Sequence, residues 1–144
     1  MIERLLIVCE GNICRSPTAE FLLRNRLHGN ATVVESAGLA AVKGGPIDPV
    51  AESLLIEHGL TGASHVARQI TAAMISAADI VLAMERRHIS ALQAMAPPAR
   101  GKTFLLGRWQ GDAEIADPYG QQRPAFEQAY RQIDAAMESW LSRF

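Results

Sequence analysis

The stretch VCEGNICRSPTAE, residues 8–20, brings a cysteine, a glycine, an asparagine and an arginine into one turn-sized segment. Arg15 follows Cys9 by six positions. The backbone N–H groups of so tight a loop can surround a tetrahedral oxyanion, and a guanidinium offers a planar fork to two of its oxygens. The same positive field favours the thiolate form of the cysteine, which is then a nucleophile facing a bound phosphate. The segment therefore predicts a site for phosphoryl transfer.

Each of these residues also has a simpler interpretation. A cysteine at the end of a strand is usually a small buried hydrophobic residue, and a Gly-Asn pair alone is typical of an ordinary turn. The combination indicates chemistry, because Gly11 and Asn12 tolerate the left-handed backbone that a loop with inward-pointing amides requires. Ser16 as cap, followed by Pro17 and Glu20, then predicts a helix N-terminus, whose positive dipole end would add to the anion site.

Phosphoryl transfer also needs an acid, because expelling an alkoxide or phenolate is slow unless a positioned carboxylic acid protonates it. The segment GDAEIADPYG, residues 111–120, offers Asp117 as the first candidate, and Tyr119 beside it could stack on an aromatic substrate. Asp112 and Glu114 are rival acids on the same loop. Spacing alone does not choose among the three, and an Asp-Pro pair is commonly just a turn.

Length and composition bound the class of protein. The chain has 144 residues, of which 49% are hydrophobic, so we expect a single domain over residues 1–144. Fourteen Lys and Arg against fifteen Asp and Glu give a formal charge of −1, which leaves no general attraction for nucleic acid or an anionic membrane. No apolar run approaches the roughly 18 residues of a membrane span, so we expect a cytoplasmic protein without membrane insertion.

The remaining polar residues exclude other classes of site. Two cysteines do not make a disulfide framework, so a reactive thiol is the better interpretation. The four histidines lack the paired spacing of zinc sites, and we expect neither a metal nor a cofactor. The basic triplet Arg86-Arg87-His88 is interpreted as the solvated face of a helix, with docking of an acidic partner tail as the alternative.

Strand-like and helix-like segments alternate along the chain. Apolar and β-branched runs predict strands at 4–8, 31–36, 78–84 and 102–106. Capping signals and helical periodicity predict helices that start at Ser16 and that span 48–59, 85–95 and 126–144. Parallel neighbours need such crossover connections. We therefore expect a three-layer α/β domain, flavodoxin/Rossmann-like, in which a four-stranded parallel sheet carries helices on both faces and binds its ligand where the strands end.

Four segments together resemble the low-molecular-weight protein tyrosine phosphatases. They are CEGNICRSPTAE at 9–20, SAG at 36–38, SHVARQI at 64–70 and DPYG at 117–120, and the resemblance covers essentially the whole chain. ESAGL, LAMERRHI and the DPYG followed by a long terminal helix are most similar to the bacterial branch that is paired with tyrosine autokinases of capsule and exopolysaccharide export. The resemblance implies a protein-tyrosine phosphatase whose substrate is such an autokinase, acting as a monomer.

The resemblance also implies a role for individual residues. Cys9 would be the nucleophile that forms a phosphocysteine, Arg15 the phosphate clamp, and Asp117 the general acid and then the base. Ser36 and His65 would support the loop through hydrogen bonds to Asn12. Ser16 would donate to the Cys9 sulfur, and Tyr119 would line the pocket wall. The phosphate-binding loop would comprise Glu10, Gly11, Asn12, Ile13, Cys14, Arg15 and Ser16.

Three loop positions bear on selectivity and redox behaviour. Glu10 stands where related enzymes often carry an apolar residue, and its carboxylate would repel strongly acidic phosphopeptides. Ile13 favours phosphotyrosine, because similar phosphoarginine phosphatases carry threonine there. Cys14 either packs the loop or traps an oxidised Cys9 as a reversible disulfide.

Two other functions fit parts of the sequence. A thiol-dependent arsenate reductase would need further cysteines downstream, and none follows Cys14. A phosphate-binding module without catalysis would have no use for an acid on a separate loop, so Asp117 argues against it.

Overall fold

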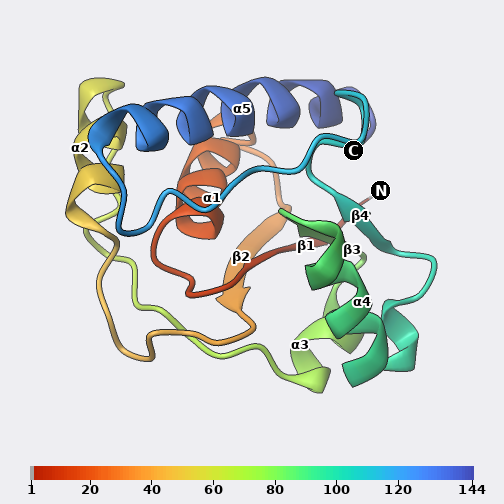
Figure 1. Cartoon of the computed structure of the whole chain (residues 1–144). Helices are drawn as coiled ribbons and strands as arrows, with labels where there is room; N and C mark the ends of the chain where they lie inside the picture. Colours follow the sequence, from red (N-terminus) through yellow and green to blue (C-terminus); the bar gives the residue numbers. More distant parts are fainter. Residues whose placement is uncertain (1) are drawn as a thin grey trace.

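Four parallel strands lie at the centre of the computed structural model, which describes residues 2–144 (Figure 1). They are β1 (Arg4–Cys9), β2 (Val33–Gly38), β3 (Ile80–Ala83) and β4 (Thr103–Leu105), and they follow the order β2-β1-β3-β4. The predicted α/β class with a four-stranded parallel sheet is confirmed.

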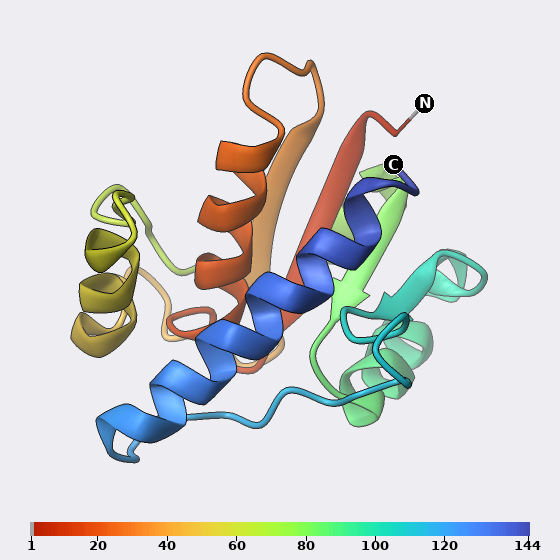
Figure 2. The ribbon, with the colours of Figure 1, turned by 90° about the horizontal axis from the view of Figure 1, so that it is seen from above.

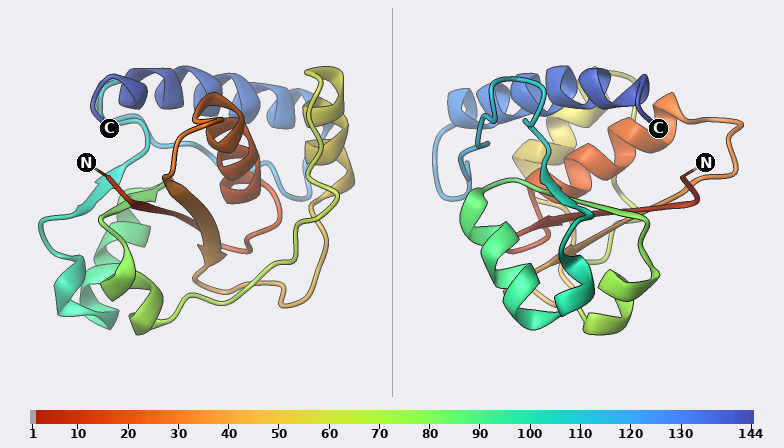
Figure 3. Two further views of the ribbon diagram at one scale, coloured as in Figure 1. Left: turned by 180° about the vertical axis from the view of Figure 1, so that it is seen from behind. Right: turned by 90° about the vertical axis from the view of Figure 1, so that its right-hand side faces the viewer.

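Helices cover both faces of this sheet, as Figures 2 and 3 show. One layer consists of α1 (Arg15–Arg26), α2 (Pro49–Glu57) and α5 (Arg123–Leu141). The other consists of α3 (Ala72–Ala77), α4 (Arg86–Met95) and the short 3₁₀ helix η1 (Pro97–Ala99). Alternation along β1 supplies both cores: Leu5 and Ile7 pack under the first layer, Leu6 and Val8 under the second.

Local signals explain where the helices begin and end. Asp48 caps α2 by accepting a hydrogen bond from the Val50 N–H at 2.8 Å, with Pro49 in the first position, as predicted. Gly59 stops the chain from continuing this helix, because it has the left-handed φ of +79°. The long α5 buries one stripe of side chains, Phe126, Tyr130, Ile133, Met137 and Trp140, at helical intervals.

The structure corrects three expectations about elements. Ser16 does not cap α1: the helix begins at Arg15, and the Ser16 side chain turns toward the site described below. The second strand lies two residues later than predicted, at 33–38. The helix α3 was not predicted, because six residues are too few for a periodic pattern; Thr71 caps it by accepting from the Met74 N–H.

The carboxyl ends of the strands define one edge of the sheet. β1 pairs with β2 on one side and with β3 on the other, so the chain's strand order reverses at β1. In parallel sheets this reversal opens a crevice at the strand ends. Cys9, the last residue of β1, lies there. Within residues 2–144, no helix has the length and apolar character that crossing a membrane requires.

Candidate active site

The loop between β1 and α1 has the backbone of an anion-binding site. The carbonyls of Cys9, Glu10 and Gly11 accept hydrogen bonds from the segment 39–42 that follows β2, at 2.9–3.0 Å. These three carbonyls are thus directed to one side of the loop. Among the described residues, no acceptor takes a hydrogen bond from the N–H groups of residues 10–14. These five amides remain available for an anion.

Asn12 gives the loop its sharp bend. It is fully buried and has a left-handed φ of 57°, which asparagine adopts more readily than most residues. Gly11, by contrast, does not have positive φ, so of the two residues that tolerate a left-handed backbone only Asn12 adopts it.

Gly38 lets the loop approach β2 closely, a requirement that sequence reasoning missed. A Cβ atom at this position would lie 2.6 Å from the Glu10 carbonyl oxygen and 3.0 Å from the Asn12 nitrogen. Real Cβ atoms do not approach so closely, and these two neighbours are backbone atoms that cannot move aside. The glycine of the SAG segment is therefore a signal of this contact.

A chain of hydrogen bonds leads from the Asn12 amide to the Cys9 sulfur. Asn12 Nδ2 donates to Ser16 Oγ at 2.7 Å, and Ser16 Oγ lies 2.9 Å from Cys9 Sγ. Because Ser16 Oγ already accepts from Asn12, its own hydroxyl hydrogen is free to point at the sulfur. Ser16 can therefore donate to a Cys9 thiolate, which is also the arrangement implied by the resemblance.

The Asn12 amide is also linked, through Ser36, to a buried carboxylate. Asn12 Nδ2 also donates to Ser36 Oγ at 2.9 Å, and Ser36 in turn donates to Glu20. Glu20 is buried and forms an ion pair of 2.6 Å with Arg24 one turn further along α1. Sequence reasoning took Glu20 only as an acidic residue of the first helical turn. The structure makes it the charged end of the network that orients Asn12.

Two residues of the 64–70 segment hold the other atoms of Asn12. His65 Nε2 donates to the Asn12 carbonyl at 2.6 Å, and the Arg68 N–H donates to Asn12 Oδ1 at 3.0 Å. The side-chain amide and the main-chain carbonyl of Asn12 are thereby fixed, while its N–H stays available for an anion. Arg68 was not among the expected supporting residues, since its contribution comes from the backbone and leaves no side-chain signal.

Arg15 is buried with one half of its guanidinium occupied and the other half free. Nη1 donates to Glu85 Oε2 at 2.6 Å and to the Ile115 carbonyl at 2.7 Å. Nη2 is buried and has no hydrogen-bond partner among the described residues, although Asp117 Oδ2 lies 3.6 Å away. A buried donor without a partner is uncommon and suits a site that receives an oxyanion.

Asp117 is the only one of the three rival acids that lines the cavity, within the described part of the chain. Glu114 instead accepts from the Arg86 N–H at 2.7 Å at the start of α4. Asp112 is exposed in a tight turn and lies near Arg108. Asp117 reaches the cavity with its carboxylate oriented by the Tyr119 N–H, which donates to Oδ1 at 3.1 Å.

The cavity above the loop has a volume of about 190 Å³ and joins the residues named so far. Cys9, Arg15 and Asp117 line it, together with Tyr119 and Val42. Tyr119 is 61% exposed and Val42 51% exposed, so both offer open apolar surface at the rim. Val42 was missed, because only an aromatic residue was sought in the 40–48 segment. A planar ring could pack between these two side chains.

Charges at the rim differ from the expectation. Glu10 does not face solvent alone, because Arg87 Nη1 donates to its Oε1 at 3.0 Å. Arg86 and Arg87 are exposed but paired with carboxylates, and His88 is completely buried. The interpretation of Arg86-Arg87-His88 as one solvated basic face is therefore wrong for His88, which the first turn of α4 directs inward.

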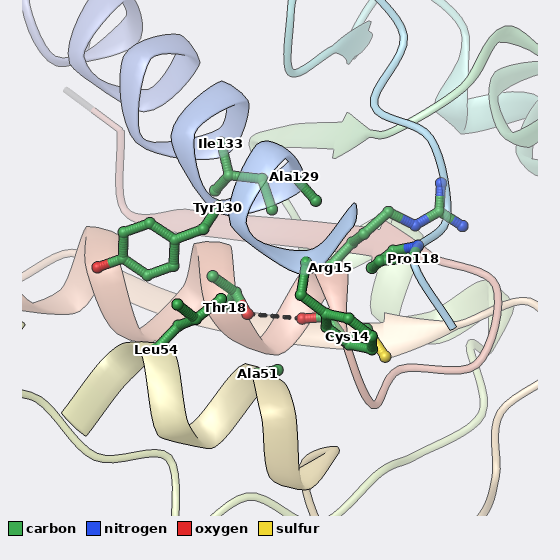
Figure 4. A pocket seen from close by; sticks show the side chains of 10 residues that line it. Cys14, Arg15, Thr18, Ala51, Leu54, Pro118, Ala129, Tyr130 and Ile133 are labelled. Atoms are coloured by element: carbon green, nitrogen blue, oxygen red, sulfur yellow. Dashed lines mark hydrogen bonds between the residues drawn. The ribbon is translucent and has the colours of Figure 1, made fainter. Parts of the chain in front are cut away.

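Cys14 lies beneath the loop and beside a second, small cavity of about 10 Å³, room for about one water molecule (Figure 4). Figure 4 shows apolar side chains of α5 and α2 around it and the Thr18 hydroxyl donating to the Cys14 carbonyl at 2.7 Å. Burial raises the pKa of the Cys14 thiol well above its ordinary value. Cys9 and Cys14 are both free thiols here.

Potential metal ligands do not gather anywhere in the described part of the chain: no group of three or more His, Cys, Asp or Glu side chains is placed to hold an ion. The polar residues that line the cavity are instead Cys9 and Cys14, Arg15, Glu10 and Asp117, and Tyr119. These groups suit nucleophilic attack on a bound oxyanion with proton transfer by the carboxylate.

Comparison with known proteins finds the same architecture and sequence pattern. Residues 4–144 match the family model described as low molecular weight phosphotyrosine protein phosphatase. The chain is 46% identical over 140 residues to the low molecular weight protein-tyrosine-phosphatase Wzb of Salmonella typhimurium, covering 97% of this chain and 93% of that protein.

Solved structures give the same result. Wzb of Vibrio vulnificus in complex with benzylphosphonate superposes with a TM-score of 0.95 at 40% identity, covering 100% of both chains. The YwlE arginine phosphatase of Geobacillus stearothermophilus superposes with a TM-score of 0.91 at 34% identity, over 98% of this chain and 92% of that one. The fold is therefore compatible with more than one phosphorylated side chain.

Proposed function

The chain belongs to the low molecular weight phosphotyrosine protein phosphatase family, and we propose that it hydrolyses phosphotyrosine through a phosphocysteine on Cys9. One observation carries this mechanism. The Cys9 thiol, the free half of the Arg15 guanidinium and the Asp117 carboxylate line the same cavity, and the five backbone amides of residues 10–14 have no hydrogen-bond partner among the described residues. Nucleophile, anion clamp and acid thus lie around one space in which a phosphoryl group fits.

The first step transfers the phosphoryl group to sulfur. The Cys9 thiolate attacks phosphorus, so that an S–P bond forms while the P–O bond to the tyrosine ring breaks. Asp117 gives its proton to the departing phenolate oxygen. Arg15 and the loop amides bind the equatorial oxygens throughout.

The second step returns the enzyme to its starting state. Water attacks the phosphorus of the phosphocysteine and passes a proton to Asp117, the S–P bond breaks, and inorganic phosphate leaves. The Ser16 hydroxyl donates to Cys9 Sγ and stabilises the thiolate as it departs.

Phosphotyrosine is the substrate that the cavity walls favour. An aryl group can pack between Tyr119 and Val42, and Ile13 adds an apolar surface to the same cavity. A guanidine-linked phosphoryl group would place a polar, charged group against that surface, which costs desolvation energy. This is the reason to expect phosphotyrosine rather than phosphoarginine here.

The experiment is parallel hydrolysis of phosphotyrosine, phosphoserine and phosphoarginine by the wild type and by Cys9→Ser. We expect turnover of phosphotyrosine that depends on Cys9, and little turnover of the other two. A labelled phosphoryl group should be trapped during turnover on the wild-type protein, at Cys9. Wild-type turnover by Cys9→Ser would defeat the mechanism, while preferred turnover of phosphoarginine would defeat only the substrate assignment.

We infer that the natural substrate is a bacterial tyrosine autokinase of exopolysaccharide or capsule production. We also infer that the phosphatase is a monomer and acts in the cytoplasm. The support is the similarity of ESAGL, LAMERRHI and DPYG to that branch of the family. An autophosphorylated kinase of this class should lose its phosphotyrosine in the presence of the wild type but not of Cys9→Ser. Equal rates on unrelated phosphotyrosine proteins would contradict this partner, and a dimer in size-exclusion chromatography would contradict the monomer.

A further inference from the structure

His88 is the one buried histidine that no hydrogen bond accounts for among the described residues. It lies in the first turn of α4 with 0% exposure, and neither Nδ1 nor Nε2 has a partner. Buried polar atoms are nearly always paired, because an unpaired one loses its hydrogen bonds to water. An apolar side chain would fill the same space without that loss. The position of His88 therefore calls for a reason other than packing.

The surroundings of His88 supply one. Its Nε2 lies 3.7 Å from Glu85 Oε2 and 3.7 Å from Glu10 Oε1, between two carboxylates from different parts of the chain. Glu85 Oε2 is the atom that accepts from Arg15 Nη1 at 2.6 Å, and Glu10 belongs to the phosphate-binding loop. Arg87 bridges the same two carboxylates from the solvent side.

We propose that His88 is a positioning residue for Arg15, which it serves by directing an Nε2–H between Glu85 and Glu10. A movement of about 0.8 Å would bring either carboxylate to ordinary hydrogen-bond distance. The imidazole thus restrains Glu85, whose Oε2 also accepts from Arg15 Nη1, and keeps the guanidinium aimed at the cavity. This inference rests on the proposed function, since the aim of Arg15 matters only if the loop binds a phosphoryl group.

The protonation state of His88 determines whether it keeps Arg15 in position or draws Glu85 away from Arg15. The charged groups that face it are Glu10 from the loop, Arg15 from α1, and Glu85 and Arg87 around the start of α4. Burial and then the Arg15 charge lower the pKa of His88, so the ring is neutral in neutral solution. A second proton would place a cation beside Arg15 and attract Glu85 away from it. Arg15 is therefore positioned best when His88 is neutral.

The test compares two substitutions of nearly the same size. His88→Leu fills the space but removes both nitrogens, whereas His88→Gln keeps an N–H donor group. With an aryl phosphate as substrate, we expect His88→Leu to lower kcat about tenfold or more with little change in KM, because misplacing a transition-state contact costs rate rather than ground-state affinity. His88→Gln should recover much of kcat. His28→Leu, at an exposed histidine far from the cavity, is the matched control and should behave as the wild type.

Wild-type kcat in His88→Leu would overturn the inference, and so would equal losses in both variants accompanied by equal losses of melting temperature. If His88→Leu does not fold, the wild type decides: its His88 ring signals, titrated by NMR, should move to a lower midpoint when inorganic phosphate binds, because the phosphate site is best arranged when His88 is neutral. An unmoved titration overturns the inference. The proposed function fails separately, through activity of Cys9→Ser.

Discussion

Ser16 Oγ lies between the Asn12 amide, from which it accepts a hydrogen bond, and the Cys9 sulfur, to which its hydroxyl donates once Cys9 is a thiolate. The two distances, 2.9 Å to Cys9 Sγ and 2.7 Å from Asn12 Nδ2, place all three polar groups in one buried line. A hydroxyl oxygen held beside the sulfur before the substrate arrives can stabilise a thiolate with little rearrangement.

Ser16→Ala should therefore slow turnover by about 10- to 100-fold, corresponding to the ~1.5–3 kcal/mol of a hydrogen bond to a charged group. The thiolate is the leaving group of the second step, so the phosphocysteine should accumulate as a burst in rapid-quench kinetics. Ser90→Ala, an exposed serine on α4, should leave the rate unchanged. A Ser16→Ala enzyme with unaltered kcat and no burst would contradict this account.

Asp117→Asn should slow aryl phosphates by about 10²–10⁴-fold, with the largest losses for phenolates of high pKa, because these need the proton most. The measurement is kcat/KM against leaving-group pKa. Asp112→Asn and Glu114→Gln serve as controls, since neither carboxylate lines the cavity. A loss in Asp117→Asn that is the same for every leaving group would point to another acid.

Gly38→Ala should displace the loop, because the new Cβ would meet the Glu10 carbonyl oxygen at 2.6 Å. We expect a loss of about 1–3 kcal/mol in the free energy of unfolding and weaker binding of inorganic phosphate. Gly11→Ala is the matched control for stability, since its Cβ would meet only side chains at an ordinary 3.7 Å. Equal unfolding free energies of Gly38→Ala and the wild type would refute the close approach.

Acid should destabilise the fold in part through His88. Burial, with Arg15 beside the ring, lowers the pKa of His88 from the ordinary 6.5. As the pH falls through 6.5 the unfolded chain takes up a proton, whereas the folded protein does so only at a lower pH. The unfolded state therefore binds more protons in that interval. This contribution to stability is fully present above pH 6.5 and is lost as the pH falls toward the folded pKa.

The check is urea unfolding of the wild type and His88→Leu between about pH 5 and pH 8. The dependence of stability on pH below 6.5 should be shallower in His88→Leu, and His28→Leu, which removes an exposed histidine, should keep the wild-type dependence. Identical slopes in wild type and His88→Leu would show that His88 does not titrate as described.

Sequence patterns sufficed for the sheet and for the location of the site. Alternation along β1 and the helical stripe of α5 are set by burial on one or two faces, which leaves a regular trace in the sequence. The Asp48-Pro49 cap of α2 is equally local. The short α3 and the true start of α1 were not predictable, because they depend on contacts with distant segments rather than on any nearby repeat.

The same distinction holds within the site. Cys9, Arg15 and Asp117 could be named as candidates because their residue types carry the chemistry. Spacing alone could not choose Asp117 over Glu114, since both lie on one loop; the resemblance named Asp117, and the structure shows that it lines the cavity. Glu20 and His88 could not be assigned at all: each is a polar residue on a helix, where the sequence predicts exposure, and each is buried by a tertiary contact.

The position of the acid is fixed by the residue two places before it. The Ile115 N–H donates a hydrogen bond to the Met84 carbonyl at 3.0 Å, and the Ile115 carbonyl accepts one from Arg15. Both main-chain polar groups of Ile115 are therefore held in place. The turn that precedes it, residues 108–112, is closed separately by the bridge between Gly107 and Ala113. Insertions in that turn would cost little, about 0.6 kcal/mol for each doubling of loop length. This loop can therefore vary in length ahead of Ile115 without moving Asp117, and it cannot vary after it.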